Sequence, residues 1–395
     1  MALSDGGPTR RAGAWITLLS ILAIGGFTLT PGGHGPPPST ASGYLVTDVV
    51  LNVILFFPLG VGLALLGIRP GTAIALGFFT STSIELAQLW VIPDRFASVH
   101  DVLTNTLGTA FAVILTRHWK TRSTWWPAVA PWVLGAATLA WALGAFLVRP
   151  STPIPGRWYP QWAHEFGGSQ FSGTILSLSL QGVPLPDGHL DETEGLRESL
   201  RRGDPLRLSI TLRAGPDQVG SSEIGAIISG DHEELVGVWQ NGRSIRTRIR
   251  LRLSDAMLRN PWVVVEDALP GRPGDTVTVL VEGTRHQVRV RVIRDGTTLA
   301  RTLRLAPELF WSGFFPFDFA ASLRTLWWPI FPAAPSLGVM GLAGHKRPWL
   351  LAAGLAVALI LAPVAAGISL PGLPLLVTAA VTVGLGALMA RRIGL

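Results

Sequence analysis

The chain contains no cysteine among its 395 residues. This absence excludes disulfide bonds, thiol catalysis and cysteine-ligated metal sites. Charge is also scarce, because charged residues make up 14% of the sequence, against about 25% in an ordinary soluble protein. Acidic residues are the smaller part of that charge, so the formal net charge is +7. The composition therefore favours a membrane protein over a soluble one.

The basic balance does not by itself indicate a nucleic-acid partner. The sequence contains no basic nucleic-acid recognition motif. Arginines at the ends of apolar helices and on polar strand faces account for the excess of positive charge. We expect no nucleic-acid partner.

Long apolar runs dominate both ends of the chain. A spanning helix needs about 20 mostly apolar residues, and about eight segments fit that rule. They are Gly13–Thr30, Leu45–Gly67, Thr72–Val91, Val99–Thr116, Trp126–Val148, Leu323–Leu342, Trp349–Ile368 and Leu373–Met389. The first run follows Arg10 and Arg11 as a signal peptide would, but the topology favours a retained helix.

Lysine and arginine are concentrated in alternate connections between these runs. Cytoplasmic loops carry such an excess, so these connections are assigned to the cytoplasm. The residues are Arg10, Arg11, Arg69, Arg117, Lys120, Arg122, Lys346, Arg347, Arg391 and Arg392. We therefore expect a protein integral to a bacterial cytoplasmic membrane, with both termini cytoplasmic and the long middle region extracytoplasmic.

That middle region has the pattern of an all-β domain. Short runs of alternating apolar and polar residues recur between turn signals such as Asn241-Gly242. Ile245–Leu253 shows the alternation best, with Arg at every second position. The other runs are Gly173–Gln181, Leu206–Leu212, Glu223–Ser229, Leu235–Gln240, Thr276–Glu282, Gln287–Arg294 and Thr298–Leu305. The pattern predicts an inserted β-sandwich or jelly roll.

The predicted organisation has three regions. Residues 1–148 form a transmembrane module, 149–309 an extracytoplasmic sandwich, and 310–395 a three-helix transmembrane region. The fold class is thus an α-helical membrane protein that carries an all-β insertion.

The apolar runs between Asp48 and Gly108 carry polar groups at helical spacing. Ionisable groups inside a membrane are costly and face a shared interior or water. The groups are Asp48, Asn52, Glu85, Gln88, Asp101 and Asn105, with Arg95 and His100 in or beside the intervening loop. Residues three or four positions apart share a helix face, so each pair points one way.

These motifs resemble the VanZ-like membrane family. The resemblance rests on Asp48-x-x-x-Asn52 with Phe57-Pro58-Leu59-Gly60, Ser83-x-Glu85-x-x-Gln88, Arg95, and Asp101-Val102-x-x-Asn105-Thr106-x-Gly108. The family is named for a protein that confers resistance to the glycopeptide teicoplanin. The resemblance implies a role at the cell envelope and a membrane fold.

Several roles remain open for this polar set. The groups can satisfy one another and fix helix packing, or they can form a pocket for a lipid headgroup. Glu85 and Asp101 are the candidates for catalytic acid and base. Asp48, Asn52, Gln88, Arg95, His100 and Asn105 are the candidate ligand-binding residues. Glu85, His100 and Asp101 can also be considered as ligands of a divalent cation, but their spacing gives this no support, and no cofactor or metal is predicted.

The β-region resembles concanavalin A-like, laminin-G-type jelly rolls. Phe171-x-Gly173-x-Ile175, Glu223–Ser229, Val238–Gly242 and Ile245–Arg250 carry the resemblance. It implies carbohydrate binding, and some such domains also bind calcium. The residue types available for a sugar site are Trp158, Trp162, Trp239, Trp262, Asp231 and His232. Core packing is the competing role for each tryptophan.

Three functions follow from these patterns. The first is an envelope protein that binds or senses a glycan, peptidoglycan component or glycopeptide. The second is a membrane enzyme that acts on a lipid-linked envelope substrate. A transporter is the weakest, because no inverted repeat or paired broken helices occur in the sequence. The expected partners are membrane lipids and an envelope glycan or lipid-linked precursor, and the sequence leaves the oligomeric state open.

Overall fold

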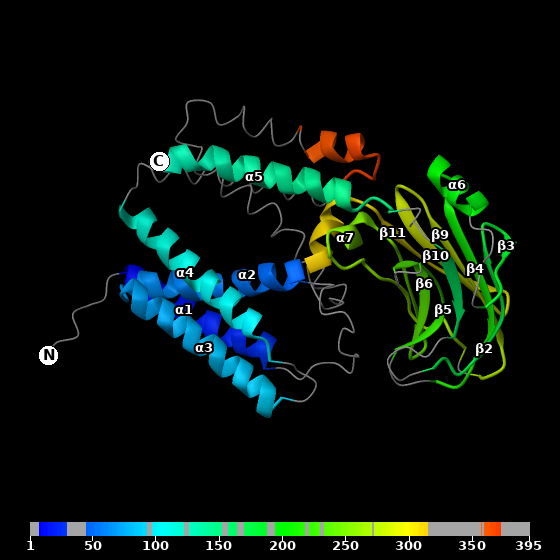
Figure 1. Cartoon of the computed structure of the whole chain (residues 1–395), viewed down its shortest axis with the longest axis horizontal. Coiled ribbons are helices and arrows are strands. Elements are labelled where there is room, and N and C mark those ends of the chain that lie inside the picture. The colour runs from blue at the N-terminus through cyan, green and yellow to red at the C-terminus, as the bar shows by residue number, and fades with distance from the viewer. Residues whose placement is uncertain are drawn as a thin grey trace. The chain divides into compact units, whose positions relative to one another are not determined.

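The computed structural model describes residues 8–29, 45–92, 97–121, 126–151, 157–163, 170–187, 194–217, 221–229, 233–270, 272–314, 357 and 359–372. Contacts group the chain into two units, Met1–Ala128 and Val129–Leu395. The helices of the first unit are blue to cyan in Figure 1, and the strands of the second are green to yellow. Each unit is described on its own.

Four long helices make up the first unit. They are α1 (Pro8–Thr28), α2 (Leu45–Leu65), α3 (Pro70–Trp90) and α4 (Val99–Thr121). All four form at the predicted apolar runs. α3 begins with Pro70 at its first position, where the missing N–H costs nothing.

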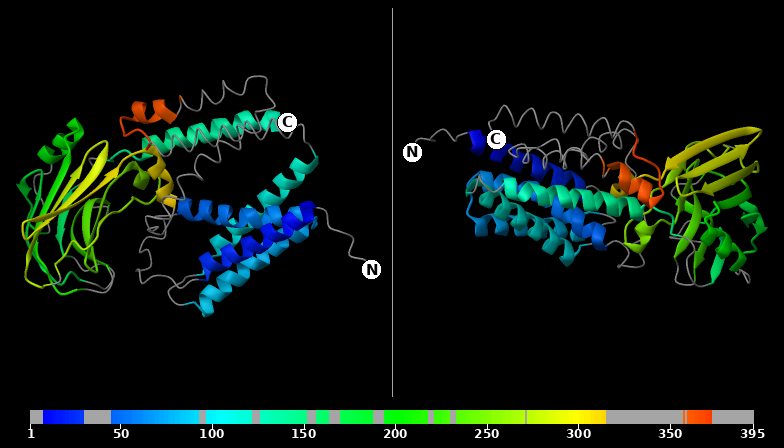
Figure 2. Two further views of the ribbon diagram at one scale, coloured as in Figure 1. Left: turned by 180° about the vertical axis from the view of Figure 1, so that it is seen from behind. Right: turned by 90° about the horizontal axis from the view of Figure 1, so that it is seen from above.

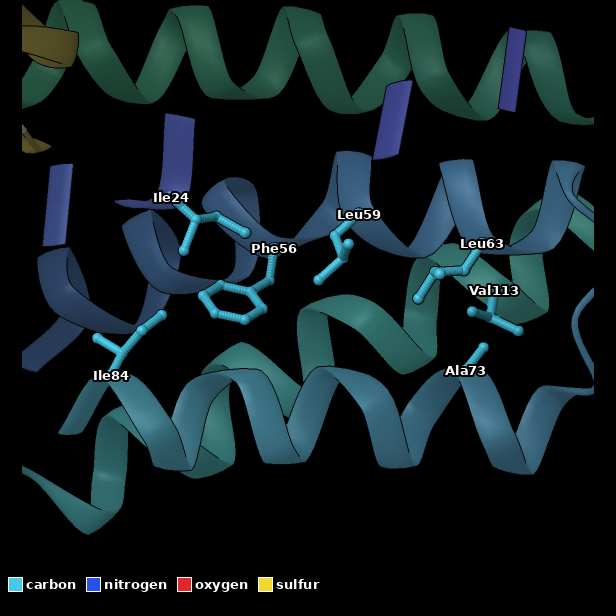
Figure 3. Packing of buried hydrophobic residues seen from close by; sticks show 7 residues of the cluster. All are labelled: Ile24, Phe56, Leu59, Leu63, Ala73, Ile84 and Val113. Atoms are coloured by element: carbon cyan, nitrogen blue, oxygen red, sulfur yellow. The ribbon is translucent and has the colours of Figure 1, made fainter. Parts of the chain in front are cut away.

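Apolar side chains from all four helices meet in one core (Figure 3). α2 contributes three of the buried residues, Phe56, Leu59 and Leu63. α3 adds two, Ala73 and Ile84, and α1 and α4 add one each, Ile24 and Val113. α2 is therefore the central element of this core.

Small residues let the helix backbones of this unit approach closely. A Cβ added to Gly60 of α2 would lie 2.4 Å from the Thr109 carbonyl oxygen of α4. One added to Gly108 would lie 2.6 Å from the Val53 carbonyl oxygen. Gly77 of α3 faces the side chain of Thr109 in the same way. Such contacts are typical of helices that pack in a membrane.

The prediction of about eight spanning helices is wrong for the residues that the structure describes. Within them, two segments are long and apolar enough to cross a membrane, Thr9–Thr28 and Asp48–Leu65. α3 and α4 are long enough, but their hydroxyl, amide and charged side chains lower their hydropathy. The predicted helices at 323–342 and 373–389 lie outside the described residues, as does most of 349–358.

The second unit contains two antiparallel sheets (Figures 1 and 2). The first has the strand order β1 (Trp158–Trp162), β5 (Ser221–Ser229), β6 (Glu234–Asn241), β7 (Ser244–Ile249), β8 (Val263–Val265). The second has the order β11 (Thr297–Arg304), β10 (Gln287–Arg294), β9 (Thr276–Gly283), β4 (Leu206–Arg213), β2 (Thr174–Leu180), β3 (Val183–Pro184). Both sheets send apolar side chains into one core, because Gly225 of β5 lies against Leu178 and Ile210, and Gly283 of β9 lies against Ile249.

The predicted β-domain is therefore confirmed as a region of two antiparallel sheets. A jelly-roll or concanavalin A-like assignment stays a prediction. The sequence patterns missed the short strands β1, β3 and β8 and the helix α6 (Glu194–Arg202). The run Ile245–Leu253 is a strand only to Ile249, and α7 (Arg252–Asp255) then interrupts its alternation.

The chain enters and leaves the sandwich through neighbouring segments. α5 (Trp126–Leu147) leads in, and the 3-10 helix η2 (Pro307–Phe314) follows the last strand. Gly144 of α5 packs against the Phe310 side chain. The Ser369 amide also donates a 2.9 Å hydrogen bond to the Leu305 carbonyl.

Candidate functional site

The predicted polar set begins with a contact between α2 and α4. The Asn52 side-chain amide donates to Asp101 Oδ1 at 2.9 Å and to Thr104 Oγ1 at 3.2 Å. Asp101 lies in the first turn of α4, where a carboxylate is favoured by the helix dipole. The contact thus joins two of the predicted ligand-binding positions across a helix interface.

Glu85 is used differently. This residue is only 7% exposed, and its Oε2 accepts a 2.7 Å hydrogen bond from the Ser98 backbone amide. Ser98 precedes α4, and its carbonyl accepts from the Asp101 and Val102 amides. Glu85 therefore holds the N-terminus of α4 against α3, in the place of a cap.

Two further amides link α3 to its neighbours. Gln88 donates to the Thr28 carbonyl at the end of α1, at 3.0 Å. Asn105 of α4 donates to Ser81 Oγ of α3 at 2.9 Å, and both residues are buried. The Asn105 Oδ1 atom is buried and accepts no hydrogen bond from any residue that the structure describes. The polar pairs thus fasten α1, α2, α3 and α4 to one another.

Three further predicted site residues are exposed or lie outside the described residues. Asp48 and His100 are exposed, and Arg95 lies outside the described residues. Within the part of the chain that the structure describes, no three His, Asp or Glu side chains are grouped to hold a metal ion. The cation ligand set Glu85, His100 and Asp101 is therefore not assembled here.

The sequence analysis identified the polar residues of these contacts but not their hydrogen-bond partners. Ser81, Ser98 and Thr104 complete the contacts. The Ser98-x-x-Asp101 spacing before an apolar run is a helix-start signal that the sequence analysis did not use. Nothing in the sequence pointed to the Glu85–Ser98 hydrogen bond.

A second cluster of functional residue types lies on the outward face of the five-stranded sheet. Ile245, Thr247 and Ile249 of β7 are buried, so the intervening Arg246 and Arg248 face outward. The Arg248 guanidinium carbon lies 4.9 Å from the ring centre of Trp239 and 4.6 Å from that of Trp262. The two indoles meet edge to face, with ring centres 5.0 Å apart.

A carboxylate completes this aromatic cluster. Glu234 of β6 accepts two hydrogen bonds from Arg248 Nε, at 3.0 and 3.1 Å, and a third from Nη2 at 2.7 Å. Such a bidentate pair fixes the guanidinium in one orientation. Trp239, Trp262, Arg248 and Glu234 are hereafter called the outer-face cluster.

Glu223 of β5 lies beside this cluster, paired in register with Trp239. The residue is only 3% exposed, and its Oε1 atom has no hydrogen-bond partner. Burial, and then the charge of Glu234, raise the pKa of Glu223 to about 8, although Arg248 opposes the shift. Glu223 is therefore mainly protonated at neutral pH and able to donate a hydrogen bond.

The other residues considered for a sugar site are divided. Trp158 is fully buried and so has a packing role, with the Arg197 guanidinium 5.3 Å from its ring centre. Trp162 is half-buried in β1. Asp231 and His232 lie outside the described residues.

Comparison with known protein families gives a match in the helical unit. The family model described as VanZ/LLP1 matches residues 15–120, which include α1 to α3 from Trp15 onward and nearly all of α4. This confirms the VanZ-like resemblance for that segment, and with the two apolar helices it indicates membrane association. No curated protein and no solved structure matches the chain.

Proposed function

We propose that this protein is an envelope membrane protein whose β-sandwich binds a glycan or glycopeptide at the outer-face cluster. The observation that carries the proposal is the pair Trp239 and Trp262 around Arg248. Indole rings offer the flat apolar surface on which sugar rings stack. Arg248, Glu234 and the protonated Glu223 offer donors and acceptors for hydroxyl groups.

The membrane arrangement is part of the proposal. The Lys and Arg distribution supports cytoplasmic termini and an extracytoplasmic sandwich. The absence of cysteine makes this arrangement simple to test, because an introduced cysteine is the only thiol. Thr302→Cys in β11 should react with an impermeant maleimide in intact cells, and Arg69→Cys before α3 only after lysis. The reverse pattern would place the sandwich in the cytoplasm.

Glycan binding is tested with the full chain in detergent. Trp262→Ala should lower retention on purified peptidoglycan about tenfold, if stacking contributes on the order of 1.4 kcal/mol. Arg207→Gln is the control. Like Arg248, Arg207 lies close to a carboxylate, 3.6 Å from Glu282, but it belongs to the other sheet. If both variants and the unaltered chain are retained equally, and thermal unfolding is unchanged, the outer-face cluster does not bind the glycan.

The buried carboxylate Glu85 favours a second candidate function. Glu85 of α3 accepts from the Ser98 amide just before α4, and Asp101 lies in the first turn of α4, so both carboxylates are in the matched segment. In this alternative, Glu85 and Asp101 serve as acid and base on a lipid-linked envelope substrate. Glu85→Gln and Asp101→Asn should then each abolish any effect of the protein on glycopeptide susceptibility, while the amount of protein in the membrane stays normal. If the effect on glycopeptide susceptibility survives both substitutions, the hypothesis of a membrane enzyme with these two catalytic residues is excluded.

A further inference from the structure

Two arginines, Arg149 and Arg252, meet where α5 ends and the sandwich begins. Arg149 follows the last turn of α5, and Arg252 is the first residue of α7. The Arg252 amide donates to the Arg149 carbonyl at 2.9 Å. Both guanidinium groups lie over the ring of Phe146, with their central carbons 5.9 and 4.4 Å from its centre.

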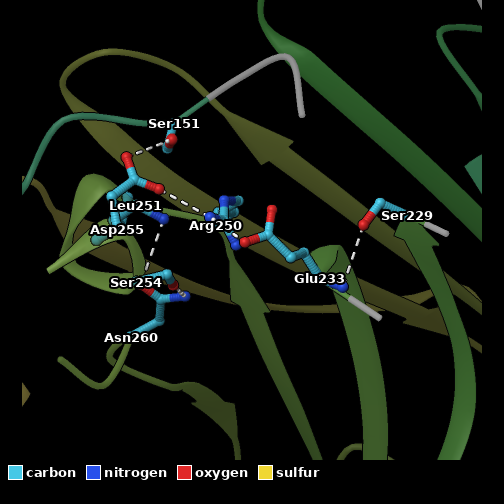
Figure 4. Close-up of polar contacts among 8 residues, drawn as sticks. All are labelled: Ser151, Ser229, Glu233, Arg250, Leu251, Ser254, Asp255 and Asn260. Atoms are coloured by element: carbon cyan, nitrogen blue, oxygen red, sulfur yellow. Dashed lines mark hydrogen bonds and ion pairs between the residues drawn. The ribbon is translucent and has the colours of Figure 1, made fainter. Parts of the chain in front are cut away.

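Arg250, which precedes Arg252 by two residues in the chain, has a different environment. Arg250 donates to Glu233 Oε1 at 3.0 Å and to Asp255 Oδ1 at 2.7 Å (Figure 4). Its charge is therefore compensated by two carboxylates. Ser151 also donates to Asp255, at 2.9 Å.

Arg149 and Arg252 have no such compensation. None of the ion pairs among the described residues includes Arg149, Arg252 or Arg285. Burial, and then the charges of Arg252 and Arg285, lower the pKa of Arg149. The charges of Arg252 and Arg285 thus both oppose the charge of Arg149.

The C-terminus of α5 explains only part of this arrangement. The carbonyls at a helix C-terminus attract cations, but they carry only about half an elementary charge. One arginine is enough to balance that dipole. A second guanidinium on the same ring leaves a positive charge that a bound anion would neutralise.

An apolar stripe leads directly to the arginines. Leu139, Leu143 and Phe146 of α5 are 70, 47 and 43% exposed. Their spacing places them on one helix face, and Arg149 follows just after the end of that helix. This surface therefore changes from apolar to cationic within one helical turn, as expected for contact with an anionic amphiphile.

We propose that Arg149 and Arg252, stacked on Phe146, form a binding site for a phosphate group. Planar guanidinium groups bind phosphate through paired hydrogen bonds, and aromatic stacking orients them for it. The phosphate belongs either to an anionic lipid headgroup or to a soluble phosphate compound. This site is separate from the outer-face cluster and does not depend on the proposed glycan binding.

The test compares two double variants of the full chain. Arg149→Gln with Arg252→Gln removes the site, and Arg289→Gln with Arg301→Gln removes the same charge from exposed residues of β10 and β11. Each protein is reconstituted into phosphatidylcholine vesicles that contain a minor share of phosphatidylglycerol. The lipid retained by the re-extracted protein is measured by mass spectrometry. Binding of inorganic phosphate to the protein in detergent is measured by calorimetry.

Phosphatidylglycerol retention should fall by about tenfold or more in the first variant and remain unchanged in the second, since even one charge-assisted hydrogen bond is worth about tenfold. Loss of inorganic phosphate binding with unchanged lipid retention would also support the site and assign it to a soluble phosphate. No loss in either assay would overturn the proposal. Arg149→Lys with Arg252→Lys, which keeps the charge and the fold, should lose part of the binding, because lysine lacks the planar fork.

Discussion

The two units of this protein hold their buried polar groups in different ways. In the helical unit, Gln88 and Asn105 each donate one hydrogen bond between helices, and Asn52 donates two. In the sandwich unit, Arg248 and Arg250 are held by several hydrogen bonds to carboxylates and, for Arg248, by indole rings. The helical contacts thus act mainly on packing. The sandwich keeps charged groups in fixed positions at its surface, which is the arrangement that recognition of a ligand requires.

The largest effect on stability is expected from substituting Glu223, whose carboxyl group is buried in the sandwich. Its raised pKa of about 8 means that the folded state binds a proton which the unfolded state releases above about pH 4.5. Stability should therefore fall as pH rises from about 4.5 to 8, because the unfolded state holds fewer protons. Glu223→Gln should match the unaltered chain at pH 4 and be more stable by roughly 5 kcal/mol at pH 9. Thermal unfolding at the two pH values measures this difference, and a pH-independent difference would contradict the protonated state.

Arg250→Gln should have the next largest effect. The substitution leaves Glu233 and Asp255 without their shared cation, although both carboxylates retain partial access to water. We expect a loss of about 3 kcal/mol, at the lower end for a broken buried ion pair. Arg202→Gln, which breaks an exposed pair with Asp204 at 3.5 Å, should cost under about 1 kcal/mol. Similar losses for both would mean that Arg250 is solvated.

The same substitution at two glycines should have opposite signs in the helical unit. Gly60→Ala forces α2 and α4 apart and should cost about 2 kcal/mol, as overpacking does. Gly26→Ala in α1 meets no atom within 4 Å and should stabilise the helix by under about 1 kcal/mol. Unfolding in a mild detergent compares the two. A stabilising Gly60→Ala would show that the helices are not in close contact there.

The smallest expected effect belongs to Asn52→Ala. It removes the hydrogen bonds to Asp101 and Thr104, and interhelical bonds of this kind are worth about 1 kcal/mol. A loss of activity much larger than this loss of stability would assign Asn52 to a working site. The matched comparison is Gln88→Ala, which removes one hydrogen bond to the Thr28 carbonyl.

Periodicity predicted most of the fold, because it reports the buried face of each element. The predicted starts of α2, α4 and α5 coincide with the observed ones, and the alternation of β7 places Ile245 and Ile249 inside and Arg248 outside. Periodicity does not report where a chain turns, so Arg250 and Arg252 were expected on a strand. Arg250 instead ends in an ion-pair network, and Arg252 begins α7.

The candidate sites were predicted less completely than the elements. The polar positions Asn52, Glu85 and Asp101 follow from helical spacing and a family resemblance. Their partners depend on tertiary geometry, as the hydrogen bond from the Ser98 backbone to Glu85 illustrates. The raised pKa of Glu223 depends on burial and on Glu234, and neither is visible from the sequence around it.

The adjacency of Gly144 and Phe310 has a consequence for how the gene has been assembled. The segments that lead into and out of the sandwich touch each other, so about 160 residues leave and rejoin the rest of the chain at nearly one point. A domain attached in this way can be acquired, lost or replaced in a single recombination event without lengthening the path between its flanking helices. Relatives that carry the helical module alone, or with a different insert at this junction, are therefore expected.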